Sequence, residues 1–347
     1  MRVVRAWAVL LGAVLPLVAP AAAEAAPSLP SWTVTPTGVT AQLRGLAAVS
    51  GEVAWASGSK GTVLRTTDAG RTWQQVAPPD TAALDFRDIE AFDAGHAVTL
   101  SIGPGESSRI YRTEDGGAHW RLTFRNPDPK AFYDCLAFFD HRRGLAMSDP
   151  VDGAFRLQAT DDGGRSWHQV PAEGLPPALP GEAGFAASGQ CVSTAGPRDA
   201  WLATGGGARA RVLHSRDGGL HWQAAETPLP SSRSAGVFAV AFRDRRHGVA
   251  IGGDYAQPDA PGPAVALSRD GGRGWRTPPE APKGYRSGLA WRGGAVLAVG
   301  PGGSDLSVDG GRHWRSFDTG SFDSVGCTPR GDCWASGVNG RVARLTR

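Results

Sequence analysis

Beyond its first residues, the sequence has no long hydrophobic run. A membrane-spanning helix needs about 20 consecutive apolar residues, and no stretch after residue 25 has that character, so we expect no membrane span. The apolar run at residues 6–18 is also too short, and Pro16 interrupts it. It follows two arginines and precedes the small residues 21–23, an order typical of a secretory signal peptide. We therefore predict a cleaved signal peptide at residues 1–25 and a secreted or periplasmic protein.

The sequence also lacks a large charge of either sign. The formal net charge is only +3 over 347 residues. A nucleic-acid surface needs a concentrated basic face. We therefore expect no nucleic-acid partner, and we expect a monomer.

Motifs for cofactors and catalysis are missing as well. There is no Cys-x-x-Cys pair, no His-rich cluster and no Gly-x-Ser-x-Gly motif. The run Gly205-Gly206-Gly207 lacks the strand, helix and acidic residue that a dinucleotide site requires. We expect no metal and no cofactor, and we find no assembled catalytic set.

One short pattern, Ser/Thr-x-Asp-x-Gly-x-x-Trp, occurs six times. Examples are TTDAGRTW at residues 66–73 and SVDGGRHW at residues 307–314. The carboxylate can accept backbone N–H groups in a tight turn, and glycine tolerates a positive φ angle there. We interpret the aspartates as structural rather than catalytic; they are Asp68, Asp115, Asp162, Asp217, Asp270 and Asp309.

The spacing of these boxes indicates the fold. Intervals of about 40 to 55 residues fit one four-stranded propeller blade, and alternating apolar residues surround each box. The C-terminal segment repeats the strands that precede a box, whereas SWTVTPTG near the N-terminus resembles the strand that follows one. The sequence therefore predicts an all-β, seven-bladed propeller over residues 26–347, closed by residues 31–36 pairing with residues 322–347.

On these motifs the chain resembles the BNR/Asp-box propellers of the YVTN/WD40/BNR-like group. Within that group it is similar to exported proteins of the photosystem II stability and assembly factor type, on units such as AWASGSKGTVLRTTDAGRTW and GVAIGGDYAQPDA. The resemblance covers nearly all of the mature chain. It implies seven blades and a role in binding or assembly without catalysis.

In such a propeller, the long loops that lead into each innermost strand share a face opposite the Asp boxes. Loops on a rigid scaffold commonly carry function. Aligning the innermost strands gives one residue per blade at the channel mouth; these are Arg44, Arg87, Asp134, Gln190, Phe238, Ser287 and Asp323. Nearby in sequence are Phe86, Tyr133, Asp254, Tyr255, Tyr285 and Arg286. The ring could bind a polar ligand or a partner's side chains, or its arginines could simply pair with neighbouring aspartates.

The four cysteines are treated as two pairs. Cys327 and Cys333 flank a hairpin that a disulfide could bridge in an oxidising compartment, and the bridged and free states stay open. Cys135 and Cys191 fall at the same register in adjacent blades, so their side chains should point in the same sense. For that pair we expect two free buried thiols.

Two functions compete at this point. The first is a non-catalytic module whose loop-rich face binds an exported or envelope protein. The second is a glycoside hydrolase, sialidase-like or glucan-cleaving, with carboxylates at the channel mouth; Asp134 with Asp323 or Asp254 is the trial pair. The scarcity of Glu near a Tyr on that face favours the first.

Overall fold

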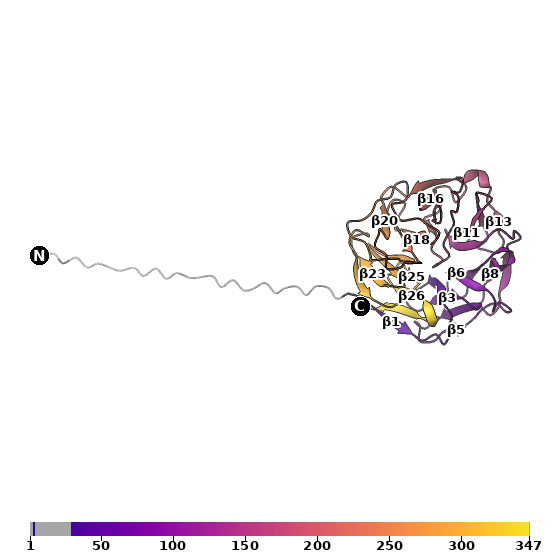
Figure 1. Cartoon of the computed structure of the whole chain (residues 1–347). Helices are drawn as coiled ribbons and strands as arrows, with labels where there is room; N and C mark the ends of the chain where they lie inside the picture. The colour runs from indigo at the N-terminus through magenta and orange to yellow at the C-terminus, as the bar shows by residue number, and fades with distance from the viewer. Residues whose placement is uncertain (1–2, 4–28, 347) are drawn as a thin grey trace.

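Seven antiparallel sheets surround a central axis (Figure 1) in the part of the chain that the computed structural model describes, residue 3 and residues 29–346. The predicted signal peptide, residues 1–25, lies outside the described residues except for Val3. Within the described ranges, no helix has the length and hydrophobicity to cross a membrane. The seven-bladed propeller predicted from the repeats is confirmed.

The strands of each blade run outward from the axis in chain order, except in blade 7. Blade 1 holds β2 (Leu43–Ala48), β3 (Ala54–Gly58), β4 (Thr62–Thr66) and β5 (Gln74–Gln75). Blade 2 holds β6 (Asp85–Ala91), β7 (Ala97–Ile102), β8 (Arg109–Thr113) and β9 (Arg121–Arg125). Blade 3 holds β10 (Tyr133–Phe138), β11 (Gly144–Val151), β12 (Ala154–Thr160) and β13 (His168–Gln169). Blade 4 holds β14 (Val192–Ala195), β15 (Asp199–Ala203), β16 (Arg211–Ser215) and β17 (Trp222–Glu226).

The remaining blades complete the ring. Blade 5 holds β18 (Ala235–Phe242), β19 (Gly248–Asp254) and β20 (Val265–Ser268). Blade 6 holds β21 (Gly288–Arg292), β22 (Ala295–Gly300), β23 (Gly303–Ser307) and β24 (Arg315–Asp318). Blade 7 holds β25 (Ser324–Cys327), β26 (Cys333–Ser336), β27 (Val342–Thr346) and, outermost, β1 (Ser31–Thr35). Short 3-10 turns lie at η1 (Gly105–Ser107), η2 (Ala172–Gly174) and η3 (Val338–Gly340).

The two ends of the described chain close the ring, as predicted. Strand β1 pairs antiparallel with β27, with Ser31 opposite Thr346 and Thr35 opposite Val342. Figure 1 shows β1 beside the C-terminal strands. Strand β1 covers the edge of β27 that would otherwise be exposed. Because β1 precedes blade 1 in the chain, this pairing also links the first blade to the last.

The Asp boxes form the turns between the third and fourth strands. In the box of blade 3, Thr160 Oγ1 donates to Asp162 Oδ1 at 2.9 Å, and Gly164 N donates to Thr160 Oγ1 at 2.9 Å. Ser166 N donates to Asp162 Oδ1 at 3.0 Å. The same contacts recur in the other boxes. Hydrogen bonds lower the pKa of the box aspartates, to about 2 in four of the six. These carboxylates serve the turn, in agreement with the structural interpretation.

Buried tryptophans join neighbouring blades. Trp55, Trp201 and Trp334 occupy equivalent positions on the second strands and are fully buried. Trp55 Nε1 donates to Asp93 O of blade 2 at 3.1 Å, and Trp334 Nε1 donates to Ser50 O of blade 1 at 3.0 Å. Each ring therefore buries apolar area between two blades and satisfies its only polar group.

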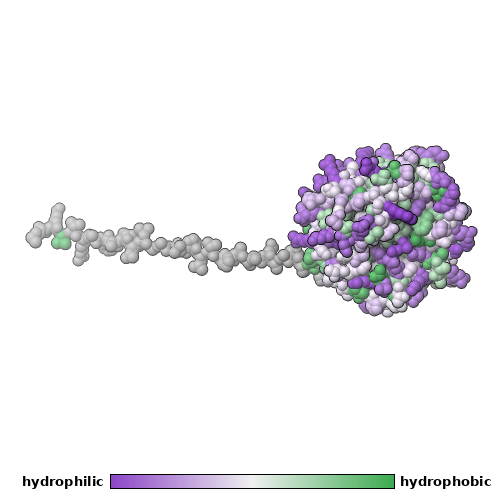
Figure 2. Space-filling model, in the orientation of Figure 1, coloured by the Kyte–Doolittle hydropathy of each residue, from purple (hydrophilic) through white to green (hydrophobic). Residues whose placement is uncertain are grey.

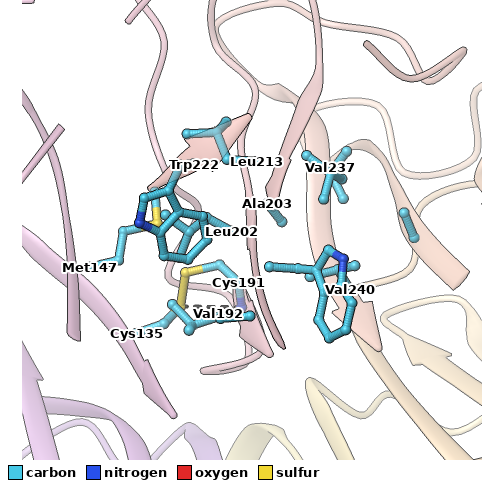
Figure 3. Packing of buried hydrophobic residues seen from close by; sticks show 14 of the residues in the cluster. Cys135, Met147, Cys191, Val192, Leu202, Ala203, Leu213, Trp222, Val237 and Val240 are labelled. Atoms are coloured by element: carbon cyan, nitrogen blue, oxygen red, sulfur yellow. Dashed lines mark hydrogen bonds between the residues drawn. A yellow bond between two sulfur atoms is a disulfide. The ribbon is translucent and has the colours of Figure 1, made fainter. Parts of the chain in front are cut away.

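The cysteines form two disulfides, and one of our expectations is wrong. Cys327 and Cys333, opposite each other on β25 and β26, are bridged. Cys135 and Cys191 are also bridged, with Cα atoms 5.9 Å apart, inside the usual range for a disulfide. Figure 3 shows this bond among packed side chains that include Met147 and Val192. The register argument failed because a bulge precedes Cys135 and because Cys191 lies just outside β14, so the two side chains are not rotationally equivalent.

The surface is mostly hydrophilic. On the face turned to the viewer in Figure 2, hydrophobic residues are scattered among polar ones rather than gathered in one large patch. Exposed large hydrophobic side chains include Leu220, Tyr255 and Val308. Tyr255 is the one of these three that lines the cavity described below.

Candidate functional site

The predicted ring positions lie outside the regular strand ladders in all seven blades. In four blades the innermost strand carries a β-bulge, and the residue inserted there is the ring residue; these are Arg44, Arg87, Asp134 and Phe238. A bulge leaves one residue unpaired and redirects its side chain. In the other three blades the ring residue, Gln190, Ser287 or Asp323, precedes the strand. The backbone therefore frees this ring of side chains from blade packing.

The chain itself closes the central channel below this ring. Residues 184–190, here called the plug segment, lead from blade 3 toward β14. Gln190 Nε2 donates to Leu289 O at 2.8 Å and to Val325 O at 3.0 Å, which belong to blades 6 and 7. On the other side of the axis, Arg87 Nη1 of blade 2 donates to Ala186 O at 2.9 Å. The channel mouth is thus a depression whose base is crossed by the plug segment.

This depression is a cavity of about 530 Å³, which we call the cup. That volume is within the range of small-molecule and side-chain binding sites. Its walls come from six blades and its floor includes the plug segment. The side chains that line it include Gln42, Arg44, Arg87, Phe132, Asp134, Asp149, Phe185, Phe238, Tyr255, Tyr285 and Asp323.

Blades 1 and 2 supply a basic wall. Arg87 Nε donates to Asp85 Oδ2 at 2.9 Å, which holds its guanidinium in place. Arg44 donates no hydrogen bond to any described residue, and its Nε is buried 3.9 Å from Asp323 Oδ1. Burial and then the neighbouring Arg87 lower the pKa of Arg44. Two guanidinium groups that repel each other, one without hydrogen-bond partners, make a site that favours an anion.

Blade 3 supplies a pair of carboxyl groups. Asp134 is 1% exposed, and its side chain hydrogen-bonds with that of Asp149. Asp149 Oδ1 also accepts a hydrogen bond from Gly184 N at 2.7 Å, whereas Asp134 Oδ2 accepts none from an N–H or O–H group of the described chain. Burial raises the pKa of Asp149 to about 6 and that of Asp134 well above its usual value. Two carboxylates in contact cannot both ionise easily, so their proximity favours protonation of one of them.

Aromatic side chains form the third wall. Phe185 of the plug segment stacks on Phe238 of blade 5, with ring centroids 4.2 Å apart. Tyr285 meets Phe238 edge to face at 4.7 Å, and Tyr255 packs near both Phe185 and Phe238. Tyr255 is 53% exposed, so this wall ends at the rim of the cup. It forms an apolar surface beside the arginines of blades 1 and 2 and the carboxyl pair of blade 3.

Several predicted residues therefore gather in the cup. They are Arg44, Arg87, Asp134, Phe238, Tyr255, Tyr285 and Asp323. Asp323 also accepts hydrogen bonds from Gln42 Nε2 at 3.1 and 3.3 Å. The pairing of Arg44 with Asp323, which the sequence left open, is present as a long contact rather than a hydrogen bond.

The other predicted residues do not line the cup. Tyr133 is buried inside blade 3, where its hydroxyl accepts a hydrogen bond from Gln158. Arg286 is 3% exposed and pairs with Asp305 at 2.7 Å. The Gln190 side chain hydrogen-bonds across the axis as part of the plug segment. Asp254 accepts a hydrogen bond from Ala256 N at 2.9 Å and so caps the turn that follows it. Ring neighbours in sequence alternate between the axis and the blade interior, which explains the misplacement of Tyr133 and Arg286.

The lining residues that sequence reasoning missed include Gln42, Phe132, Asp149 and Phe185. Asp149 lies on β11, the second strand of blade 3, whereas the alignment compared only the innermost strands. No sequence pattern indicated Phe185 or the plug segment, because the alignment treated Gln190 as part of an innermost strand. That strand begins only at Val192.

The cup combines three kinds of group that are typical of a binding site. Its guanidinium groups can hold an anion, its carboxyl pair can accept hydrogen bonds, and its aromatic wall can hold an apolar group. The described residues include no group of three or more His, Cys, Asp or Glu that could hold a metal ion. The carboxyls of Asp134 and Asp149 are in contact, closer than the separation of about 5 Å or more that flanks a glycosidic bond.

Sequence comparison finds no relative: no protein-family model and no curated protein matches the chain. Comparison of structures finds many. A structure described as YCF48 bound to D1 peptide matches with a TM-score of 0.64 at 16% identity, over 91% of this chain and 95% of that one. YCF48 from Cyanidioschyzon merolae matches with a TM-score of 0.62 at 17% identity, over 90% and 98%.

Enzymes also match. The GH74 enzyme of Niastella koreensis gives a TM-score of 0.62 at 14% identity, over 89% of this chain and 53% of that enzyme, so this chain spans about half of its length. The chain is therefore a seven-bladed propeller that matches YCF48 structures in fold. At these identities the structural similarity shows the fold alone, so the function has to be inferred from the residues of the cup.

Proposed function

We propose that the protein is a non-catalytic binding module that takes an acidic segment of an exported or envelope protein into the cup. The observation that carries this proposal is the pair Arg44 and Arg87. Arg44 is largely buried, has no hydrogen-bond acceptor among the described residues and lies beside a second guanidinium. An incoming carboxylate would satisfy these donors and relieve the repulsion between the two cations.

Two further observations support a protein ligand. The aromatic wall adjoins the basic wall, so an apolar side chain next to the acidic one could be bound at the same time. YCF48, which shares the fold, is bound to D1 peptide in one of the matching structures. A blind cup admits a side chain or a short loop and excludes a chain threaded along the axis.

The test uses defined peptides, because the partner is unidentified. Fluorescein-labelled hexapeptides with blocked ends would carry one phenylalanine beside either glutamate or glutamine, and binding would be followed by fluorescence anisotropy. We expect the glutamate peptide to bind at least tenfold more tightly, and we expect the double variant Arg44→Gln/Arg87→Gln to abolish the difference. Higher salt should also weaken this binding, although less than at an exposed site.

The matched control is Arg142→Gln, an exposed arginine on the Asp-box side that should leave binding unchanged. Equal affinity for both peptides, or full binding by the double variant when its melting temperature is normal, would overturn the proposal.

Hydrolysis of glycosides is the second candidate, favoured by the fold of the GH74 enzyme and by the carboxyl groups in the cup. Contact between Asp134 and Asp149 counts against them as a catalytic pair. Assay on a panel of glycosides separates the two functions: turnover that is lost in Asp134→Asn would establish an enzyme.

We also infer that the protein works outside the cytoplasm. Both cysteine pairs are bridged, and structural disulfides persist mainly in oxidising compartments. N-terminal sequencing of the protein from a periplasmic or secreted fraction should give a start near residue 26. An intact Met1 in the mature protein would contradict this.

A further inference from the structure

The carboxyl pair of the cup has an oxygen that the protein leaves unused. Asp134 is 99% buried, yet its Oδ2 receives no N–H or O–H donor from the described residues. Leaving a buried polar atom without a partner costs about 1–3 kcal/mol. The pair can be satisfied in two ways, by a proton shared between the carboxyls or by a hydrogen-bonding cation placed against them.

The surroundings of the pair suit a cation. Phe132 and Phe185 line the cup with the two carboxyls, and aromatic faces attract ammonium and guanidinium groups. Gly184 lies over the pair, and a Cβ atom there would stand 3.0 Å from Asp134 Oδ2. The missing side chain leaves room beside Asp134 Oδ2, and the half-buried Asp149 gives the pair its access to the cup.

The charged groups around the pair are few. Strands β10 and β11 contribute the two carboxyls themselves, and β6 contributes Arg87, whose charge acts on Asp134. Strand β6 also carries Asp85, which pairs with Arg87, and the buried Asp88, which accepts a hydrogen bond from Leu136 N of β10. The plug segment, which packs over the pair, carries no titratable side chain. Across the cup, Arg44 faces Asp323. An anion bound to the basic wall would neutralise part of the positive charge that would otherwise repel a cation here.

We propose that Asp134 and Asp149 form a second subsite of the cup, which binds an ammonium or guanidinium group of the partner segment whose acidic group lies against Arg44 and Arg87. This inference rests on the proposed function and narrows its ligand to a segment with an acidic and a basic side chain close together. The basic group replaces the proton that the carboxyls share, and that proton leaves for the solvent. Binding of the basic group is therefore coupled to release of up to one proton.

The test extends the peptide series to four members with acid and base, acid alone, base alone, and neither, using lysine as the base. In the wild-type protein at pH 7, we expect lysine to tighten binding of the acidic peptide about tenfold. In Asp149→Asn that gain should disappear while the acid-only peptide binds as before. Calorimetry in phosphate and in Tris buffer should reveal proton release with the acid-and-base peptide alone.

A purely structural pair would behave differently. If Asp134 and Asp149 only anchor Gly184, lysine will add nothing and no proton will be released, which overturns the inference while binding of the acidic peptide upholds the proposed function. If no peptide binds, both fail. Asp161→Asn, an exposed change on the Asp-box side, is the matched control.

Should Asp149→Asn unfold, Gly184→Ala serves instead, since its methyl group would crowd Asp134 Oδ2. A lysine gain that survives Gly184→Ala in a folded protein would also count against the subsite.

Discussion

The two faces of the propeller treat their carboxylates in opposite ways. On the Asp-box face, each aspartate accepts hydrogen bonds from its own turn, and those bonds lower its pKa; Asp162 is an example at about 2. On the cup face, burial raises the pKa of Asp134, Asp149 and Asp323. The first group is satisfied by the fold, and the second retains capacity for a ligand. Repetition therefore marks structure in this chain, and departures from the repeat mark the site.

The largest effect we expect concerns the two disulfides. Cys135–Cys191 closes a sequence separation of 56 residues and joins blade 3 to the end of the plug segment, whereas Cys327–Cys333 closes 6 residues within a hairpin. From loop-closure entropy, the first should contribute about 4 kcal/mol and the second about 2 kcal/mol. Urea unfolding of Cys135→Ser/Cys191→Ser and of Cys327→Ser/Cys333→Ser checks this order. Equal losses would mean that the cup face is no more dependent on its bridge than the hairpin is.

The stability of the protein should depend on pH in opposite ways for the carboxyl groups of the cup and for those of the Asp boxes. The raised pKa of Asp149 means that the folded protein binds this proton more tightly than the unfolded chain does, so its contribution to stability falls as the pH rises from about 4 through about 6. The lost free energy is up to about 3 kcal/mol. Asp149→Asn keeps an acceptor for Gly184 N but cannot ionise, so its melting temperature should exceed that of the wild type above pH 6.

The Asp boxes should respond in the opposite direction. Their lowered pKa values mean that the stabilisation is present above about pH 4, the ordinary aspartate value, and is lost as the pH falls through about 2. A wild-type stability that rises steadily from pH 4 to pH 8 would contradict the assignment of the raised group to the cup.

Removing one Asp-box aspartate should lower the free energy of unfolding by less than the loss of the Cys135–Cys191 disulfide or the ionisation of Asp149. Asp162→Ala removes the acceptor of Ser166 N, Arg165 N and the Thr160 hydroxyl, and we expect a loss of about 1–2 kcal/mol. Peptide binding in the cup should be unchanged. Asp161→Ala, the exposed neighbour, is the control for urea unfolding and should stay within about 0.5 kcal/mol of the wild type.

The same contrast explains what the sequence could predict. Six box turns and the complementary chain ends determined the blade number and the closure, because those features repeat and depend on local hydrogen bonds. Aligning one position per repeat also gave several residues that line the cup, and their role in binding stays a prediction. Asp149 and Phe185 were missed because neither lies on an innermost strand, and the alignment compared only those strands. The plug segment was mistaken for a strand because its contacts, such as Gln190 with Leu289 and Val325, join blades far apart in sequence.

The smallest effect should come from the box histidines. His119, His221 and His313 each place Nδ1 near the box aspartate, at 2.6, 2.7 and 2.5 Å, and all three are exposed. Water screens such pairs, so His119→Ala should change stability by less than about 1 kcal/mol and should leave peptide binding unaltered. Differential scanning calorimetry and anisotropy measure both. Loss of peptide binding in this variant would place function on the Asp-box face, because His119 belongs to a turn on the opposite side of the ring from the cup.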